Sequence, residues 1–241
     1  MATLELLGFG STGWGALLLV ATLMTLAVTA TALAIGAVFG TIVASAKLSG
    51  NLFLVTLGNI YTTVFRGVPE LLIIYLIYFG GSSAVTAIGQ WMGYEGFFGL
   101  PSFAAGALAV GIISGAYQAE VYRGAYLAIA KGELEAASAI GMPRSMRLRR
   151  IIMPQVLRFA IPGLGNVWQL SLKDSALISV TGLAELMRTS QVAAGSTRQY
   201  FLFFIVGGLL YLILTSLSDR VFNRAERRAN RSMPASAMGQ A

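Results

Sequence analysis

The chain has 241 residues, of which 56% are hydrophobic and only 11% are charged, and its mean hydropathy is +0.73. Soluble domains are about a quarter charged, so this composition indicates an integral membrane protein. The net charge of +7 does not indicate nucleic-acid binding, because the basic residues gather at the ends of apolar segments, as orientation signals and lipid contacts require. The absence of cysteine and histidine excludes disulfides, thiol or imidazole catalysis and most transition-metal sites.

The first apolar segment is long enough to span a membrane. No charged residue occurs from Leu6 to Ala46, and about 20 apolar residues suffice to cross a bilayer. We expect one long, tilted helix over residues 14–46 after an external N-terminal segment, residues 1–13. A cleavable signal peptide is not favoured, because a basic n-region is missing and the apolar run is too long. Within this span, Gly36 and Gly40 are spaced for close helix packing.

Lys47 follows the first span and marks that end as cytoplasmic. The second span either begins near Asn51 or restarts at Pro69, because proline suits a helix start or a kink. Arg66 and Glu70 are four residues apart and share a face only if the helix is continuous. Glu70 is either a structural partner of Arg66 or a substrate contact. The Gly-, Ser- and aromatic-rich residues 80–100 predict an external loop.

The third span is expected over residues 101–121. It carries Gly111 and Gly115 at helix-packing spacing. Glu120 lies near its cytoplasmic end and can pair with Arg123 one helical turn later. Because an ionisable group within a span is a functional candidate, Glu120 is also a candidate for the substrate pathway, and pairing and gating both remain open.

The fourth span begins near Ile151 and is interrupted by Pro162. Its later part contains Gln169, Lys173 and Asp174. Adjacent residues of opposite charge within a membrane span need separate partners or a water-filled cavity. They could meet the carboxylate and amine of a zwitterionic substrate, so we predict the substrate pathway here. A salt bridge that holds the helices together is the alternative.

The last apolar segment, residues 200–218, predicts the final span, and residues 219–241 form a basic cytoplasmic tail. The connection before it, which contains Glu185, Arg188 and Arg198, is expected to be external. Five spans with the N-terminus outside and the C-terminus inside place the other basic clusters on the cytoplasmic side. The transmembrane domain is therefore expected over residues 14–218.

A polar segment, residues 131–154, lies between the third and fourth spans. Its alanine-rich start predicts a short helix that ends at Gly141 in a left-handed cap, with Pro143 just beyond. An arginine in hydrocarbon costs roughly 3 kcal/mol, so the basic run after Pro143 must be cytoplasmic. The run consists of Arg144, Arg147, Arg149 and Arg150.

The polar segment resembles the "EAA loop" of binding-protein-dependent ABC import permeases. The matching positions are Glu135, Ala136, Ala137, Gly141, Ile151, Met153 and Pro154, with Met153 where the family usually has leucine. Tyr61-Thr62-Thr63, before Arg66, and Leu164-Gly165-Asn166-Val167-Trp168 look most like the part of this family that serves histidine, basic amino acids and opines. Two further elements resemble the amino-acid branch of the family. They are Arg66-Gly67-Val68-Pro69-Glu70, with Glu70 where leucine is common, and Leu172-Lys173-Asp174-Ser175, with Ser175 where threonine is usual.

This resemblance implies an all-α membrane protein with the type I ABC importer fold, about five transmembrane helices and a cytoplasmic coupling helix. It also implies a non-catalytic permease of the bacterial inner membrane that moves a polar or basic amino acid or an opine. Coupling to the ATPase is implied for Glu135, Ala136, Ala137, Gly141 and Pro154, whereas Arg66, Glu70 and Arg123 are candidates for structural or gating roles.

The partners that the resemblance implies are a second permease (a copy or a paralogue), two ATP-binding subunits and a periplasmic solute-binding protein. ATP and Mg²⁺ would bind to the ATPase subunits, since this chain has no Walker A pattern and is expected to bind no cofactor. An ion-coupled secondary transporter is the alternative function. It would need an internal repeat and a titratable site near the midplane, and the two halves show no obvious repeat.

Overall fold

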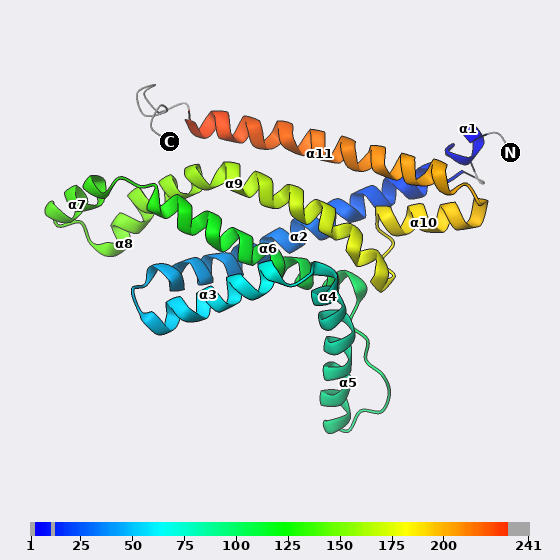
Figure 1. The fold of residues 1–241 in the computed structure, drawn as a ribbon, viewed down its shortest axis with the longest axis horizontal. Coiled ribbons are helices and arrows are strands. Elements are labelled where there is room, and N and C mark those ends of the chain that lie inside the picture. The colour runs from blue at the N-terminus through cyan, green and yellow to red at the C-terminus, as the bar shows by residue number, and fades with distance from the viewer. Residues whose placement is uncertain (1–2, 11–12, 231–241) are drawn as a thin grey trace.

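The structure is a computed structural model that describes residues 3–10 and 13–230, and it is helical throughout that part of the chain apart from short connections. Four long helices form one bundle (Figure 1): α2 (Gly15–Leu48), α6 (Ser102–Leu127), α9 (Met153–Asp174) and α11 (Tyr200–Asn230). The helix α7 (Lys131–Ala139) and the C-terminal end of α11 lie at one end of this bundle, and α10 (Leu186–Thr197) lies at the other. This is the arrangement that the predicted cytoplasmic and external segments require. The described part also contains several short helical elements, among them α1 (Thr3–Leu6), η1 (Leu76–Gly80), α8 (Arg144–Arg147), η2 (Leu148–Ile152) and η3 (Ser175–Thr181).

A seam of glycines lets α2 and α6 pack closely, and their contact is the most extensive in the bundle. A Cβ atom on Gly36 would lie only 2.2 Å from Oγ of Ser114. On Gly40, Gly111 and Gly115 it would lie 2.8, 2.7 and 2.9 Å from a side-chain atom of the opposite helix. The packing role predicted from the spacing of these glycines is confirmed.

The second apolar segment is broken, and both of its predicted starts exist. α3 (Leu52–Gly67) ends just before Pro69, and α4 (Glu70–Tyr75) begins just after it. The residue before a proline is disfavoured in the helical region, which explains the break. Arg66 and Glu70 therefore belong to different helices and do not share a continuous helix face.

The helix that starts at α4 continues to Trp91, and its last part, α5 (Gly81–Trp91), projects away from the bundle (Figure 1). The prediction of a loop over residues 80–100 is therefore wrong for its first half. Glycine and serine predict loops in water, but membrane helices tolerate both. The Ser83 hydroxyl, for example, donates to the Phe79 carbonyl (2.9 Å) and is satisfied within the helix.

Four helices in the described part of the chain are long and apolar enough to cross a membrane: Gly15–Leu48, Glu70–Trp91, Ser102–Leu127 and Tyr200–Ala229. The helix α9 has 22 residues but carries Arg158, Lys173 and Asp174, and it is not among these four. It contacts both α6 and α11, which allows its polar side chains to face protein. The fifth span stays a prediction.

The connection between α9 and α11 is packed into the bundle. α10 contacts α2 and α11, and Leu186, Ala193 and Ala194 on it are fully buried. Glu185 caps α10, accepts hydrogen bonds from the backbone N–H groups of Met187 (2.9 Å) and Arg188 (2.6 Å), and is itself fully buried. The buried Glu185 thus fixes the start of α10 at the end of the bundle opposite to α7.

Candidate functional site: the coupling segment and a buried charge cluster

The predicted short helix in the polar segment is α7, and Gly141 ends it as predicted. Gly141 has φ +72°, in the left-handed region. Its N–H donates to the Ser138 carbonyl (3.0 Å), and the Met142 N–H donates to the Ala137 carbonyl (3.0 Å). These two bonds form a Schellman motif, which satisfies two carbonyls at the helix end. The cap fixes the direction in which the chain leaves α7 and returns toward α9.

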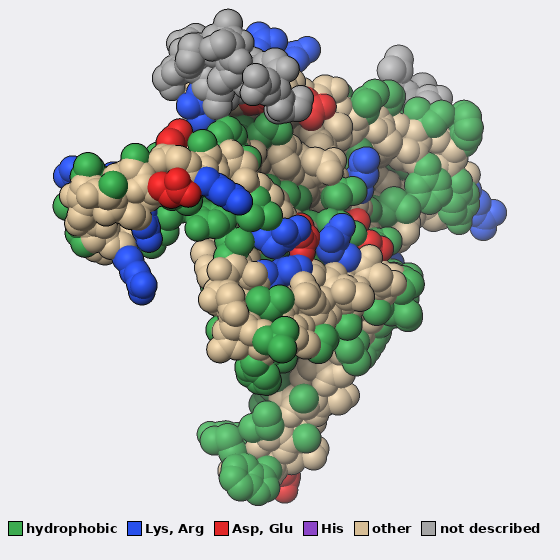
Figure 2. All heavy atoms as spheres, turned by 60° about the vertical axis from the view of Figure 1, so that its left-hand side comes forward, with side chains coloured by type: hydrophobic (Ala, Val, Ile, Leu, Met, Phe, Trp, Pro, Cys, Tyr) green, Lys and Arg blue, Asp and Glu red, His purple; other side chains and the backbone are tan. Residues whose placement is uncertain are grey.

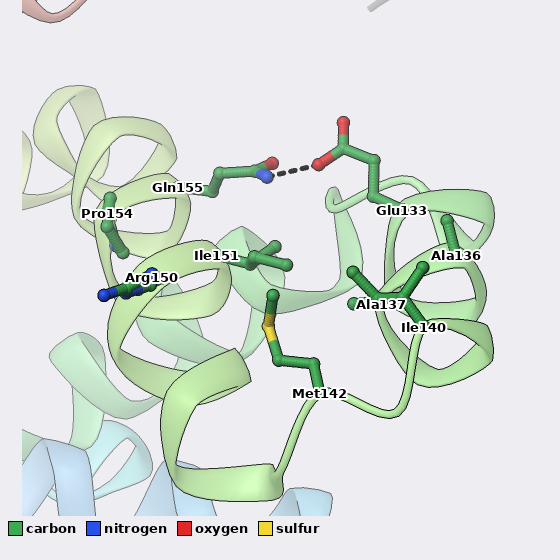
Figure 3. Close-up of a pocket in the computed structure, with 9 residues that line it drawn as sticks. All are labelled: Glu133, Ala136, Ala137, Ile140, Met142, Arg150, Ile151, Pro154 and Gln155. Atoms are coloured by element: carbon green, nitrogen blue, oxygen red, sulfur yellow. Dashed lines mark hydrogen bonds between the residues drawn. The ribbon is translucent and has the colours of Figure 1, made fainter.

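The inner face of α7 packs against η2 and the start of α9 (Figure 3). Ala137 is only 4% exposed, and the side chains of Met142 and Ile151 point toward it. Glu133, in the first turn of α7, accepts a hydrogen bond from the amide of Gln155 on α9. Between these elements lies a pocket of about 410 Å³. Ala137 lines this pocket from α7, and Ile151 and Pro154 line it from the other side.

The outer face of α7 is open. Glu135 is exposed on this face, whereas Ala136 and the 76% exposed Ile140 line the open pocket beside η2 and α9 (Figure 3). Within the described residues, no hydrogen bond or ion pair involves Glu135. Pro154 is the second residue of α9, directly after the π-helical turn η2, and it lines the pocket beside α7. Ala137, Gly141 and Pro154 thus shape the segment, Ala136 lines the open pocket, and Glu135 is presented on the surface.

A partly buried charge cluster ties three helices together. Nζ of Lys47 on α2 forms an ion pair with Oε1 of Glu120 on α6 and donates to Oγ1 of Thr62 on α3 (3.1 Å). Nε of Arg123 donates to Oε2 of Glu120 (2.9 Å). The Lys47 side chain is only 9% exposed and that of Glu120 is 22% exposed. Both ion pairs found in the described residues involve Glu120, so its predicted pairing with Arg123 is confirmed. Figure 2 shows basic and acidic side chains gathered at the centre of one face of the molecule.

Two other predicted residues have partners outside this cluster. The Arg66 guanidinium lies 5.3 Å from the centre of the Tyr117 ring, a cation–π contact that replaces the expected pair with Glu70. Nε2 of Gln169 donates to Oδ1 of Asp219 on α11 (2.7 Å). Gln169 therefore helps to hold α9 against α11.

Lys173 and Asp174 are the last two residues of α9. Lys173 is exposed and Asp174 is half-buried, and neither forms an ion pair with another described residue. The next element, η3, contacts α4, whose first residue is Glu70. The structure thus places three charged residues around one junction of the bundle, while Glu120 and Gln169 are engaged elsewhere.

Two buried charged residues have contacts that the sequence did not predict. Lys47 was expected only to mark the cytoplasmic end of a span, although it is the single charge between Glu5 and Arg66 and would need a partner inside the bundle. Glu185 was expected only in the external connection. It also accepts a hydrogen bond from the Tyr211 hydroxyl (3.0 Å), and the residues next to Glu185 in the sequence do not predict this contact.

The long apolar helices define a membrane protein with several spans. The capped polar helix α7, with one face packed and the other open, is suited to contact another protein. The chain belongs to the family described as "Binding-protein-dependent transport system inner membrane component", which matches residues 36–231. It is therefore the permease subunit of an ABC importer, a non-catalytic component of the inner membrane. Membership also implies that it works with an ATP-hydrolysing subunit and a solute-binding subunit.

Named relatives cover nearly the whole chain. It is 52% identical to the octopine transport system permease protein OccQ of Rhizobium meliloti, over 97% of this chain and 98% of that one. It is 38% identical to the histidine/lysine/arginine/ornithine transport system permease protein HisQ of Escherichia coli, over 90% and 94% of the two chains. Its fold is similar to that of an amino acid ABC transporter solved with histidines, with a TM-score of 0.75, 32% identity and coverage of 89% of this chain and 95% of that one.

Proposed function

We propose that this chain imports an opine or a basic amino acid, driven by ATP hydrolysis on separate subunits that contact α7. The observation that carries the coupling role is the two-faced α7, with Ala137 packed inward and Glu135 presented outward. The substrate class rests on the relatives that transport octopine and basic amino acids. ATP and Mg²⁺ bind to the partner subunits in this scheme.

The coupling segment is suited to transmit motion. Three contacts attach α7 to the next elements of the chain: the buried Ala137, the Glu133–Gln155 hydrogen bond and the hydrogen bond from Arg147 to the Ser138 hydroxyl. Because each contact joins α7 to η2, α8 or α9, a displacement of α7 moves the start of α9 with it. The exposed face that includes Glu135 is then free to dock on the ATPase.

The complete transporter contains a second permease, either a copy or a paralogue, two ATPase subunits and a periplasmic binding protein. A second permease is expected because five helices cannot enclose a pathway on their own. The N-terminus lies outside and the C-terminus inside. Closure of the ATPases on ATP pushes both coupling helices and alternates the cavity between outward and inward states.

The substrate passes the junction at the end of α9. Lys173 and Asp174 meet the carboxylate and the amine of the zwitterion, and Glu70 supplies an acidic group for the extra positive charge of a basic substrate. Binding there is weak, because a permease that held its substrate tightly in both states would stall. Specificity therefore comes from the binding protein. Lys47, Glu120 and Arg123 hold the helices that surround this path.

The coupling role is tested by measuring ATP hydrolysis in the reconstituted complex, with and without liganded binding protein. We expect Glu135→Lys to abolish the stimulation by ligand while the subunits still assemble. The matched control is Glu95→Lys, the same charge reversal on an exposed residue of the loop after α5, which should keep the stimulation. Full stimulation in Glu135→Lys would contradict the proposal, and so would failure of any ATPase to co-purify with the wild-type chain.

The substrate path is tested by uptake of labelled octopine and arginine into vesicles that carry the complex. A hydrogen bond to a charged group contributes about 1.5–3 kcal/mol, so Asp174→Asn should lower maximal uptake by roughly 10- to 100-fold. Glu95→Gln is the control and should transport normally. Unchanged uptake by Asp174→Asn would remove Asp174 from the path without affecting the coupling role of α7.

A further inference from the structure

Two hollows adjoin the π-helical turn η2, and residues of η2 line both of them. The first is an apolar groove of about 420 Å³ where the ends of α2 and α6 meet the start of α9. Leu48, Leu148 and Leu157 contribute to its walls. Its polar lining consists of hydroxyl groups such as those of Ser45 and Tyr126, and no charged residue lines it. A groove of this size and chemistry suits an alkyl chain.

The second hollow is a polar recess of about 530 Å³ that includes Arg149 and Arg150, the residues next to Leu148. Ser145 contributes a hydroxyl group to it, and no acidic residue lines it. Both arginines are exposed, and no ion pair within the described residues involves either of them. Two guanidinium groups beside a hydroxyl are suited to bind a phosphate.

The position of these hollows indicates which molecule fills them. They lie at the end of the bundle that carries α7 and the basic end of α11 (Figure 1), where the headgroups of the negatively charged cytoplasmic leaflet are expected. A lone anion would use only the recess, and an apolar helix would use only the groove. An amphiphile with an anionic head uses both at once.

We propose that η2 forms a binding site for one anionic phospholipid, with an acyl chain in the groove beside Leu148 and the phosphate on Arg149 and Arg150. π-Helical turns of this kind are frequent at binding sites. The site joins the first span, α2, to the start of α9 through a molecule of the bilayer.

Native mass spectrometry of the whole transporter complex, titrated with phosphatidylglycerol or phosphatidylcholine in detergent, tests this proposal. We expect one phosphatidylglycerol per copy of this chain, held in preference to phosphatidylcholine. The pair Arg149→Gln and Arg150→Gln should weaken phosphatidylglycerol binding about thirtyfold. The control pair Arg220→Gln and Arg224→Gln makes the same charge change on the exposed end of α11 and should leave binding unchanged.

A second variant separates the groove from the recess. Ser45→Trp fills the groove and should weaken the binding of both lipids without changing the preference between them. Equal affinity of the wild type for the two lipids, or equal effects of the two arginine pairs, would overturn the proposal. A photoreactive benzoylphenylalanine that replaces the half-exposed Leu157 identifies the occupant directly. Cross-linking to phospholipid supports the site, and cross-linking to a protein subunit refutes it.

Discussion

The glycine seam between α2 and α6 allows a quantitative test of the packing. In Gly36→Ala, the new Cβ atom lies 2.2 Å from Oγ of Ser114 and 2.5 Å from Nε2 of Gln118. Both atoms are held by hydrogen bonds, since Oγ of Ser114 donates to the Gly111 carbonyl (3.1 Å) and Nε2 of Gln118 donates to the Leu33 carbonyl on α2 (3.2 Å). Neither atom can therefore move away freely. Overpacking of this kind costs about 1–3 kcal/mol.

A matched control isolates this cost. Gly124 lies on α6, and a Cβ atom there meets no heavy atom within 4 Å. Both substitutions gain about 1 kcal/mol of helix propensity, which cancels in the comparison. Gly36→Ala should therefore be less stable than Gly124→Ala by about 2 kcal/mol, which lowers the midpoint of thermal unfolding by about 4–8 °C. Equal midpoints for the two variants, measured by fluorescence on the purified complex, would refute the inferred close approach.

Two further predictions concern buried charges. Lys47→Met should cost about 1.5–3 kcal/mol, because it removes one of the two cations that contact the partly buried Glu120 carboxylate, and Lys47→Met with Glu120→Met should recover part of that loss in thermal unfolding. A double variant that is less stable than the single one would contradict this. Burial raises the pKa of Glu185, although hydrogen bonds from Met187, Arg188 and Tyr211 oppose the rise. The folded state then binds the proton more tightly than the unfolded chain, so the free energy of unfolding falls as the pH rises from about 4.3 through the raised pKa. Glu185→Gln should remove this dependence between pH 4.5 and 8, and parallel curves for the two proteins would contradict the prediction.

The parts of the fold that sequence predicted well depend on neighbouring residues. The helix α7, its end at Gly141 and the turn at Pro143 are specified within a dozen residues, and the spacing of Gly36 and Gly40 already defines a packing face. The first span and the pairing of Glu120 with Arg123 are predictable for the same reason.

The parts that could not be predicted depend on the surroundings. The residues of α5 predict a loop because glycine and serine break helices in water, but they do not do so in a membrane. Lys47 and Glu120 are 73 residues apart in the chain, and their contact exists only after α2 and α6 pack. The break at Pro69 was one of two alternatives, and the choice between them depends on how α3 packs against α2 and α6.

The two faces of α7 are subject to different constraints during evolution. Ala137 must stay small whatever ATPase is present, because its neighbours belong to the same chain. Glu135 is exposed and forms no hydrogen bond or ion pair with a described residue, so it can change together with the surface of a partner. A transporter of this design can exchange one ATPase for another by substitutions on a single helical face, without repacking any helix of the membrane bundle.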